Sequence, residues 1–187
     1  MNWNSKKVLV TGGASFIGSH LTEQLLVLNA QVRVADNFSS GERKHLESLD
    51  CEVLEGDLLE PAFCDRSTKG MDVVFHLAAD HGGRGYIDAH QVECSTNMIL
   101  DGQVFRSAHR NGVEKIVFAS SGCVYPTSAQ MDVTKEVFLH EDMVTPPYEA
   151  DDLYGWAKLM AELTLKAYHQ QHGLQTASCR YFTVYGP

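Results

Sequence analysis

Basic residues are scarce relative to acidic ones in this sequence. Its 187 residues include 15 lysines and arginines against 24 aspartates and glutamates, which gives a formal net charge of −9 at pH 7. A surface that binds nucleic acid or anionic lipid needs a basic patch that releases the counterions of phosphate groups. We therefore expect no nucleic-acid partner and no membrane partner, and the metabolism of small molecules fits the charge better.

The sequence also lacks disulfide and metal-ligand patterns. It has five cysteines, an odd number, at positions 51, 64, 94, 123 and 179, and none of them shows a CxxC or Cys/His ligand spacing. This predicts no disulfide framework and no metal site, and it favours a reducing, cytoplasmic location. The first apolar run, Val8–Val10, soon ends at two glycines, so we expect no signal peptide and no membrane span.

The stretch Lys7–Leu28 changes from a strand pattern to a helix pattern across a glycine turn. Val8–Val10 leads into Thr11-Gly12-Gly13, after which apolar residues recur at helical spacing. Such a turn allows a pyrophosphate to approach the backbone and the amide-rich start of a helix, although an ordinary strand–helix turn has the same spacing. The candidate cofactor-binding residues of the turn are Gly12, Ser15, Phe16, Ile17 and Gly18.

An acidic residue ends the next predicted strand. Asp36 closes Gln31–Asp36 and lies eighteen residues after Gly18. A carboxylate at this place accepts hydrogen bonds from the adenosine ribose and repels a 2′-phosphate, so it favours NAD over NADP. The alternative is a solvated strand end.

Further strands and helices alternate along the chain. This alternation predicts an α/β fold: a doubly wound, mostly parallel sheet with helices on both faces, Rossmann-type, in one domain over residues 1–187. The predicted helix 153–171 carries more than one apolar stripe, which suggests a homodimer formed through helices 88–110 and 153–171. The predicted later strands are Glu52–Glu55, Asp72–Leu77, Lys115–Ser120 and Gln175–Phe182.

Several candidate ligand contacts follow the predicted strands. Asp57, beside Leu58, either accepts a hydrogen bond from an adenine amino group or caps the helix near Pro61. The small residues Ala78 and Ala79 leave room for a cofactor.

The segment Asp80–Tyr86 is too glycine-rich for a helix or strand. It is either a flexible crossover or a substrate loop in which Gly82, Gly83 and Arg84 contact an anionic or sugar group. His76 and His81 lack metal-ligand partners, so we interpret them as packing and polar-loop residues.

Tyr154 and Lys158 are four residues apart on a predicted helix. They share one helical face, where an ammonium favours the ionised phenol, although a surface cation–π contact has the same spacing. Lowering a tyrosine pKa from about 10 to near 7 requires roughly 4 kcal/mol, which the lysine and a nicotinamide cation together supply in a desolvated cleft.

Taken together, these motifs resemble the extended short-chain dehydrogenase/reductase family, the NAD-dependent nucleotide-sugar epimerases and dehydratases. The matching segments, in family order, are TGGASFIG, Asp36, Gly56–Leu58, Leu77–Ala79, Ser120-Ser121, YGWAK and RYFTVYGP. Within the family, residues 79–85 and 120–126 are most similar to the 3,5-epimerases of GDP-sugars.

The resemblance implies a mechanism through a transient 4-keto sugar on NAD. Tyr154 would remove the C4 hydroxyl proton, Ser121 would hydrogen-bond the ketone, and Lys158 would hold the tyrosine pKa down. Cys123 would remove or return a proton at C3 or C5 of the sugar. The alternative is that Cys123 is only a small buried residue at the end of a strand. The implied substrate is a nucleotide-diphosphate sugar, with a GDP-hexose favoured.

Two residues and the length depart from the family pattern. Ser15 replaces the usual middle glycine of the turn, and Thr183 replaces an asparagine expected at the substrate phosphate, where it remains a candidate substrate contact. Family members continue into a smaller substrate-binding domain, so we expect residues 1–187 to be the NAD-binding domain without it.

The sequence leaves other functions open. A UDP-hexose 4-epimerase needs only Ser121, Tyr154 and Lys158, and a non-catalytic NAD-binding protein needs only the cofactor cleft. A 4,6-dehydratase is disfavoured, because Gly122 and Cys123 stand where acidic residues are expected.

Overall fold

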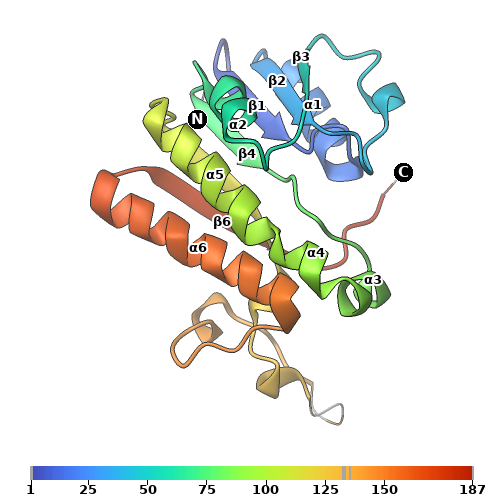
Figure 1. Ribbon diagram of the computed structural model, residues 1–187, viewed down its shortest axis with the longest axis vertical. Helices are drawn as coiled ribbons and strands as arrows, with labels where there is room; N and C mark the ends of the chain where they lie inside the picture. Colours follow the sequence, from blue (N-terminus) through green and yellow to red (C-terminus); the bar gives the residue numbers. More distant parts are fainter. Residues whose placement is uncertain (1, 132–133, 135, 187) are drawn as a thin grey trace.

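Six parallel strands form the centre of the fold (Figure 1). The computed structural model describes residues 2–131, 134 and 136–186. The two ends of the predicted domain, Met1 and Pro187, therefore lie outside the described residues, and Pro187 is also the last residue of the RYFTVYGP segment. The strands are hydrogen-bonded in the order β3-β2-β1-β4-β5-β6, and each neighbouring pair is parallel. Their bounds are β1 Lys7–Thr11, β2 Gln31–Asp36, β3 Glu52–Glu55, β4 Val73–His76, β5 Lys115–Ser121 and β6 Gln175–Tyr181. The predicted doubly wound parallel sheet is confirmed.

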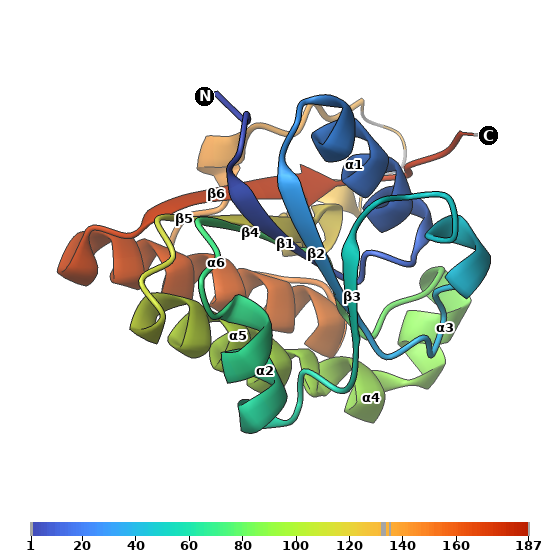
Figure 2. The same ribbon diagram turned by 90° about the horizontal axis from the view of Figure 1, so that it is seen from above.

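Helices cover both faces of the sheet (Figure 2). Helix α1, Phe16–Val27, packs on one face, and α2, Pro61–Thr68, α5, Asn97–Arg110, and α6, Asp152–His172, pack on the other. Because successive residues of a strand point to opposite faces, β1 contributes to both cores. Leu9 packs under α2, α5 and α6, whereas Val8 and Val10 pack under α1.

The prediction for residues 80–110 was wrong in two respects. The predicted helix 88–110 is three helices, α3 Arg84–Ala89, α4 Gln91–Ser95 and α5, and α3 begins inside the segment predicted to be a loop. The chain bends at His90, with φ −126° and ψ 48°, which ends α3 and starts α4. The start of α5 is fixed by Asn97, whose side chain accepts from the Asp80 N–H at 2.7 Å and donates to the Asp80 carbonyl at 2.8 Å.

The strand order reverses between β1 and β4, and ligands of open α/β sheets bind beside such a point, at the carboxyl ends of the strands. The glycine turn, the segment after β4 and the start of α6 all lie at this edge. In the part of the chain that the structure describes, no helix combines the length and the apolar character needed to cross a membrane.

Candidate active site

The glycine turn between β1 and α1 is closely packed against its neighbours. Gly12 has φ +67°, and a Cβ there would lie 2.9 Å from the Ala78 nitrogen. A Cβ on Gly18 would lie 2.2 Å from the Gly12 carbonyl oxygen, so Gly18 supports the turn from inside the helix. Ser15, the N-cap of α1, donates its hydroxyl to the Gly12 carbonyl at 2.6 Å. The serine that departs from the family pattern therefore braces the turn.

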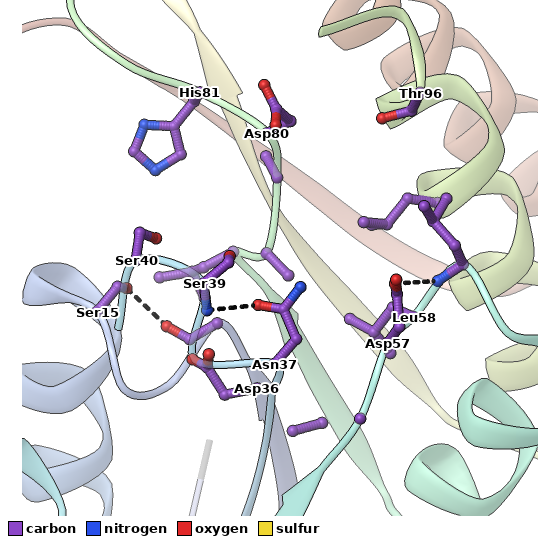
Figure 3. A pocket seen from close by; sticks show the side chains of 18 residues that line it. Ser15, Asp36, Asn37, Ser39, Ser40, Asp57, Leu58, Asp80, His81 and Thr96 are labelled. Atoms are coloured by element: carbon purple, nitrogen blue, oxygen red, sulfur yellow. Dashed lines mark hydrogen bonds between the residues drawn. The ribbon is translucent and has the colours of Figure 1, made fainter. Parts of the chain in front are cut away.

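Asp36 ties the end of β2 to the glycine turn. Its side chain is 7% exposed, and its two oxygens accept from the backbone N–H groups of Ala14, at 2.9 Å, and Phe38, at 2.8 Å. The carboxylate also lines a cavity of about 150 Å³ above the sheet edge (Figure 3). Asp36 is thus a buried, hydrogen-bonded residue at the cavity, and the alternative of a solvated strand end was wrong.

The same cavity contains residues predicted from the sequence and residues that the sequence did not reveal. Gly12, Ser15, Ala78 and Ala79 line it, and Asp57 and Leu58 lie across from Asp36 (Figure 3). Asp57 accepts from the Leu59 N–H at 2.8 Å, and Glu60 is the N-cap of α2, so the capping alternative for Asp57 was wrong. The additional lining residues are Asn37, Ser39, Ser40, Asp80, His81 and Thr96. A run of small polar residues after a strand was the signal that could have indicated the first three.

A larger cavity of about 570 Å³ adjoins the first, because Ser15, Leu77, Ala79 and His81 line both. Ser121, Cys123, Tyr154 and Lys158, which are separated by up to 37 positions in sequence, all line this second cavity. The other predicted residues that line it are Phe16, Ile17, Gly82, Arg84 and Thr183. Gly83 forms the N-cap of α3. The two cavities thus form one cleft that runs from Asp36 to Tyr154.

A close backbone contact brings Cys123 to the start of α6. The Cys123 carbonyl accepts from the Asp151 N–H at 2.9 Å, and a Cβ on Gly155 would lie 2.4 Å from that carbonyl oxygen. On the other side, the Ser121 hydroxyl oxygen accepts from the Cys123 N–H at 3.2 Å. Gly155 is thus a residue on which the site depends and that sequence reasoning did not select.

The ionisation of Tyr154 depends first on its burial. Burial, together with the neighbouring Cys123, raises the pKa of the phenol to about 12, and a hydrogen bond with Ser121 opposes this rise. Lys158 is 1% exposed, with its Nζ 4.7 Å from the centre of the Phe118 ring and 5.7 Å from that of Tyr154, and burial lowers its own pKa. Within this chain, desolvation is the largest influence on the pKa of the phenol, and the predicted lowering requires a nicotinamide cation together with the lysine.

The Arg84 side chain is held by three carboxylates. It pairs with Asp88 at 2.8 Å, with Asp152 at 2.9 Å and with Asp151, so it ties α3 to the start of α6. These partners hold the guanidinium at the wall of the larger cavity, where it was predicted to meet an anionic group. Arg84 thus lines the larger cavity with its positive charge already paired with carboxylates of this chain.

His76 is a bonded core residue. It is fully buried and contacts Thr11 at 2.7 Å and Asp101 at 2.9 Å. Among the described residues, no three histidine, cysteine, aspartate or glutamate side chains gather in a way that could hold a metal ion.

The cleft places the protein in a structural class. A glycine turn at the switch point of a parallel sheet, with a cavity at the carboxyl ends of the strands, is the arrangement of the dinucleotide-binding α/β fold.

Comparison with known proteins then gives the family. Residues 8–187 match the NAD dependent epimerase/dehydratase family, and the chain belongs to it. A GDP-mannose 3,5-epimerase of Arabidopsis thaliana is 32% identical over 99% of this chain and 49% of its own length. An epimerase from Methanothermobacter thermautotrophicus superimposes with a TM-score of 0.85 at 31% identity, over 99% of this chain and 54% of that one.

A UDP-glucose 4-epimerase of Thermus thermophilus, solved in complex with NAD, superimposes with a TM-score of 0.82 at 30% identity, over 97% of this chain and 56% of that one. The chain spans about half the length of the curated GDP-mannose 3,5-epimerases that it matches.

Proposed function

We propose that residues 1–187 form the NAD-binding domain of a nucleotide-sugar epimerase that works through a transient 4-keto sugar, like GDP-mannose 3,5-epimerase. The observation that carries the proposal is the single cleft that joins the Asp36 end to Ser121, Cys123, Tyr154 and Lys158. A dinucleotide needs both ends, one for its adenosine and one for its reactive ring.

The residues of the cleft fit NAD. The turn at Gly12 packs directly against the Ala78 backbone and lines the smaller cavity, where a pyrophosphate would approach it. Asp36 lines the smaller cavity, where it would accept hydrogen bonds from ribose hydroxyls and would repel a 2′-phosphate. Ala78 and Ala79 would lie along the cofactor, with Asp57 and Leu58 at the adenine. When bound, NAD⁺ supplies a hydride acceptor for the C4 carbon of the sugar.

The side chains of the larger cavity divide the proton transfers. Tyr154 takes the C4 hydroxyl proton as the carbonyl forms, and Ser121 donates a hydrogen bond to the carbonyl oxygen. The pKa of the phenol is raised to about 12 by burial, so ionisation at neutral pH requires a positive charge beside it. Lys158 would supply part of that charge, and bound NAD⁺ would supply the rest.

Cys123 gives the proposal its 3,5-epimerase character. The 4-keto group acidifies the C–H bonds at C3 and C5, and the Cys123 thiol lines the cavity beside Tyr154, where it can remove or return such a proton. A UDP-hexose 4-epimerase is the second candidate, because a UDP-galactose 4-epimerase structure superimposes with a TM-score of 0.83 at 35% identity. That activity uses Ser121, Tyr154 and Lys158 and has no need of a thiol.

Turnover in deuterated water separates the two functions. The protein, expressed from its own gene, is incubated with NAD⁺ and either GDP-mannose or UDP-glucose in D₂O, and the recovered sugars are analysed by NMR and mass spectrometry. Carbon-bound deuterium at C3 or C5 that disappears in Tyr154→Phe supports the proposal. Inversion at C4 without carbon-bound deuterium indicates the 4-epimerase, and NAD⁺ binding without turnover of either sugar contradicts both.

We also propose a homodimer formed through α4, α5 and α6. Large apolar side chains on these helices are exposed, among them Ile99 at 58%, Met160 at 46% and Trp156 at 37%. A second copy of this surface would bury them. Light scattering after size-exclusion chromatography should give twice the chain mass, and Met160→Glu should give a monomer. Val27→Glu, at an exposed apolar residue of α1, is the matched control.

A further inference from the structure

A chain of hydrogen bonds crosses the core beneath the cleft. It runs from Thr11, at the end of β1, through His76, at the end of β4, to Asp101 on α5. His76 is fully buried and Asp101 is 1% exposed. None of these three residues has a role in the mechanism given above.

The hydrogen-bond geometry fixes the direction of this chain. The Thr11 hydroxyl oxygen accepts from the backbone N–H groups of Leu77, at 3.1 Å, and Ala78, at 3.2 Å, which occupies both of its lone pairs. Its own hydrogen must therefore go to His76 Nδ1. A neutral imidazole with an accepting Nδ1 carries its proton on Nε2, and that N–H donates to Asp101 Oδ1. Asp101 thus accepts a hydrogen bond from His76, which fixes the orientation of its carboxylate.

The second oxygen of Asp101 has no hydrogen-bond partner among the described residues, although it is buried. A buried carboxylate oxygen without a donor is costly unless a positive charge acts on it. Lys158, on the facing helix α6, is the buried cation of this region. Burial lowers the pKa of Lys158, and the charge of Asp101 raises it. His81, which lines the same cavity, has its own pKa lowered by burial and by Lys158.

The surroundings of the two groups are aromatic. The Lys158 Nζ lies 4.7 Å from the centre of the Phe118 ring. Phe118 in turn packs against His76 and Phe105, with ring centres 5.8 Å and 5.7 Å apart. In such apolar surroundings, opposite charges interact more strongly than at a surface, even without direct contact.

We propose that Asp101, oriented by His76 and Thr11, is the buried counter-ion that holds the Lys158 ammonium in the larger cavity. Asp101 is then a positioning residue that acts on Tyr154 through Lys158. Its catalytic meaning rests on the proposed function, but the charge pairing itself belongs to the protein without any ligand.

A double-mutant cycle on the ligand-free protein tests the pairing. Asp101→Asn keeps an oxygen for His76 and removes the charge, whereas Lys158→Met removes the ammonium and keeps the length of the side chain. Each single variant leaves one buried charge without its partner and should lower Tm by about 6 °C or more. The double variant should regain at least half of the larger loss, because neither charge remains.

A matched control uses another buried carboxylate. Asp36→Asn, at the far end of the cleft, combined with Lys158→Met should give additive losses in Tm. Additive losses for Asp101→Asn and Lys158→Met would overturn the proposal. If Asp101→Asn is insoluble, a soluble double variant supports the pairing and an insoluble one contradicts it. Because no cofactor or substrate is present, a negative result leaves the proposed function intact, and a failed turnover assay leaves this test unaffected.

Discussion

Gly18 allows the dinucleotide turn to be tested by adding one methyl group. In Gly18→Ala the new Cβ would lie 2.2 Å from the Gly12 carbonyl oxygen and 2.7 Å from the Gly13 Cα. An ordinary contact is about 3.4 Å or more, so the turn must move by roughly 1 Å. Overpacking of this kind costs about 1–3 kcal/mol, which exceeds the gain of about 0.5–1 kcal/mol from replacing a helical glycine by alanine. We expect a net loss of stability of about 1–2 kcal/mol.

The same movement should weaken NAD binding, because the Gly12 backbone would no longer match the pyrophosphate. We expect the Kd for NAD⁺ to rise at least tenfold, which corresponds to about 1.4 kcal/mol. Gly102→Ala is the matched control: Gly102 is also inside a helix, α5, but a Cβ there would meet nothing within 4 Å. That variant should gain about 0.5–1 kcal/mol and bind NAD⁺ unchanged.

Urea unfolding at a fixed protein concentration and calorimetric NAD⁺ titration measure both quantities. We expect the free energy of unfolding to fall in Gly18→Ala and to rise in Gly102→Ala. The Kd for NAD⁺ should change in Gly18→Ala alone. If Gly18→Ala is as stable as the unmodified protein and binds NAD⁺ equally well, the close packing of the turn does not govern the cofactor site.

Three further predictions concern single side chains. The pKa of Tyr154 is raised to about 12, so the stability it contributes, up to about 2–3 kcal/mol, is fully present below pH 10 and lost as pH rises from 10 to 12. Cys64, whose pKa is also raised to about 12, adds to the loss seen in urea unfolding over this range, so the loss in Tyr154→Phe should be smaller by the Tyr154 share and not absent; an equal loss would contradict the assignment. Cys123→Ser should reduce deuterium incorporation at C3 and C5 by about 10²-fold or more while transient NADH still forms; equal incorporation would exclude the thiol. Asp36→Asn removes a hydrogen-bond acceptor from one backbone N–H and from the ribose, so NAD⁺ affinity should fall about tenfold and the preference for NAD⁺ over NADP⁺ should become smaller. An unchanged ratio of the two Kd values in calorimetry would contradict the assignment.

The sequence predicted those parts of the fold that depend on local patterns. The strands and the glycine turn follow from apolar runs that end in small residues, and Asp36 from its distance to Gly18. The choice of Ser121, Cys123, Tyr154 and Lys158 came from the resemblance to the family, and the alternation of strands and helices explains why they line one cavity, because it brings strand ends and helix starts to one edge.

What the sequence did not predict depends on contacts between distant segments. The start of α5 depends on the contact between Asn97 and Asp80, which are 17 residues apart. The break between α3 and α4 at His90 has no signal in the apolar pattern. The pairing of Arg84 with Asp151 and Asp152 joins two segments that have no common pattern. The raised pKa of Tyr154 is a consequence of burial, which no spacing of tyrosine and lysine reveals.

The central claim is that NAD lies along the cleft with its nicotinamide beside Tyr154. A crystal structure of the protein with NAD⁺ measures this directly, through the distance between the nicotinamide ring and the phenol oxygen. The account predicts adenosine ribose hydroxyls at Asp36 and the nicotinamide ring in the larger cavity, within about 5 Å of the phenol. A nicotinamide more than about 10 Å from Tyr154 would contradict it, because the two groups could not act on the same carbon of a sugar.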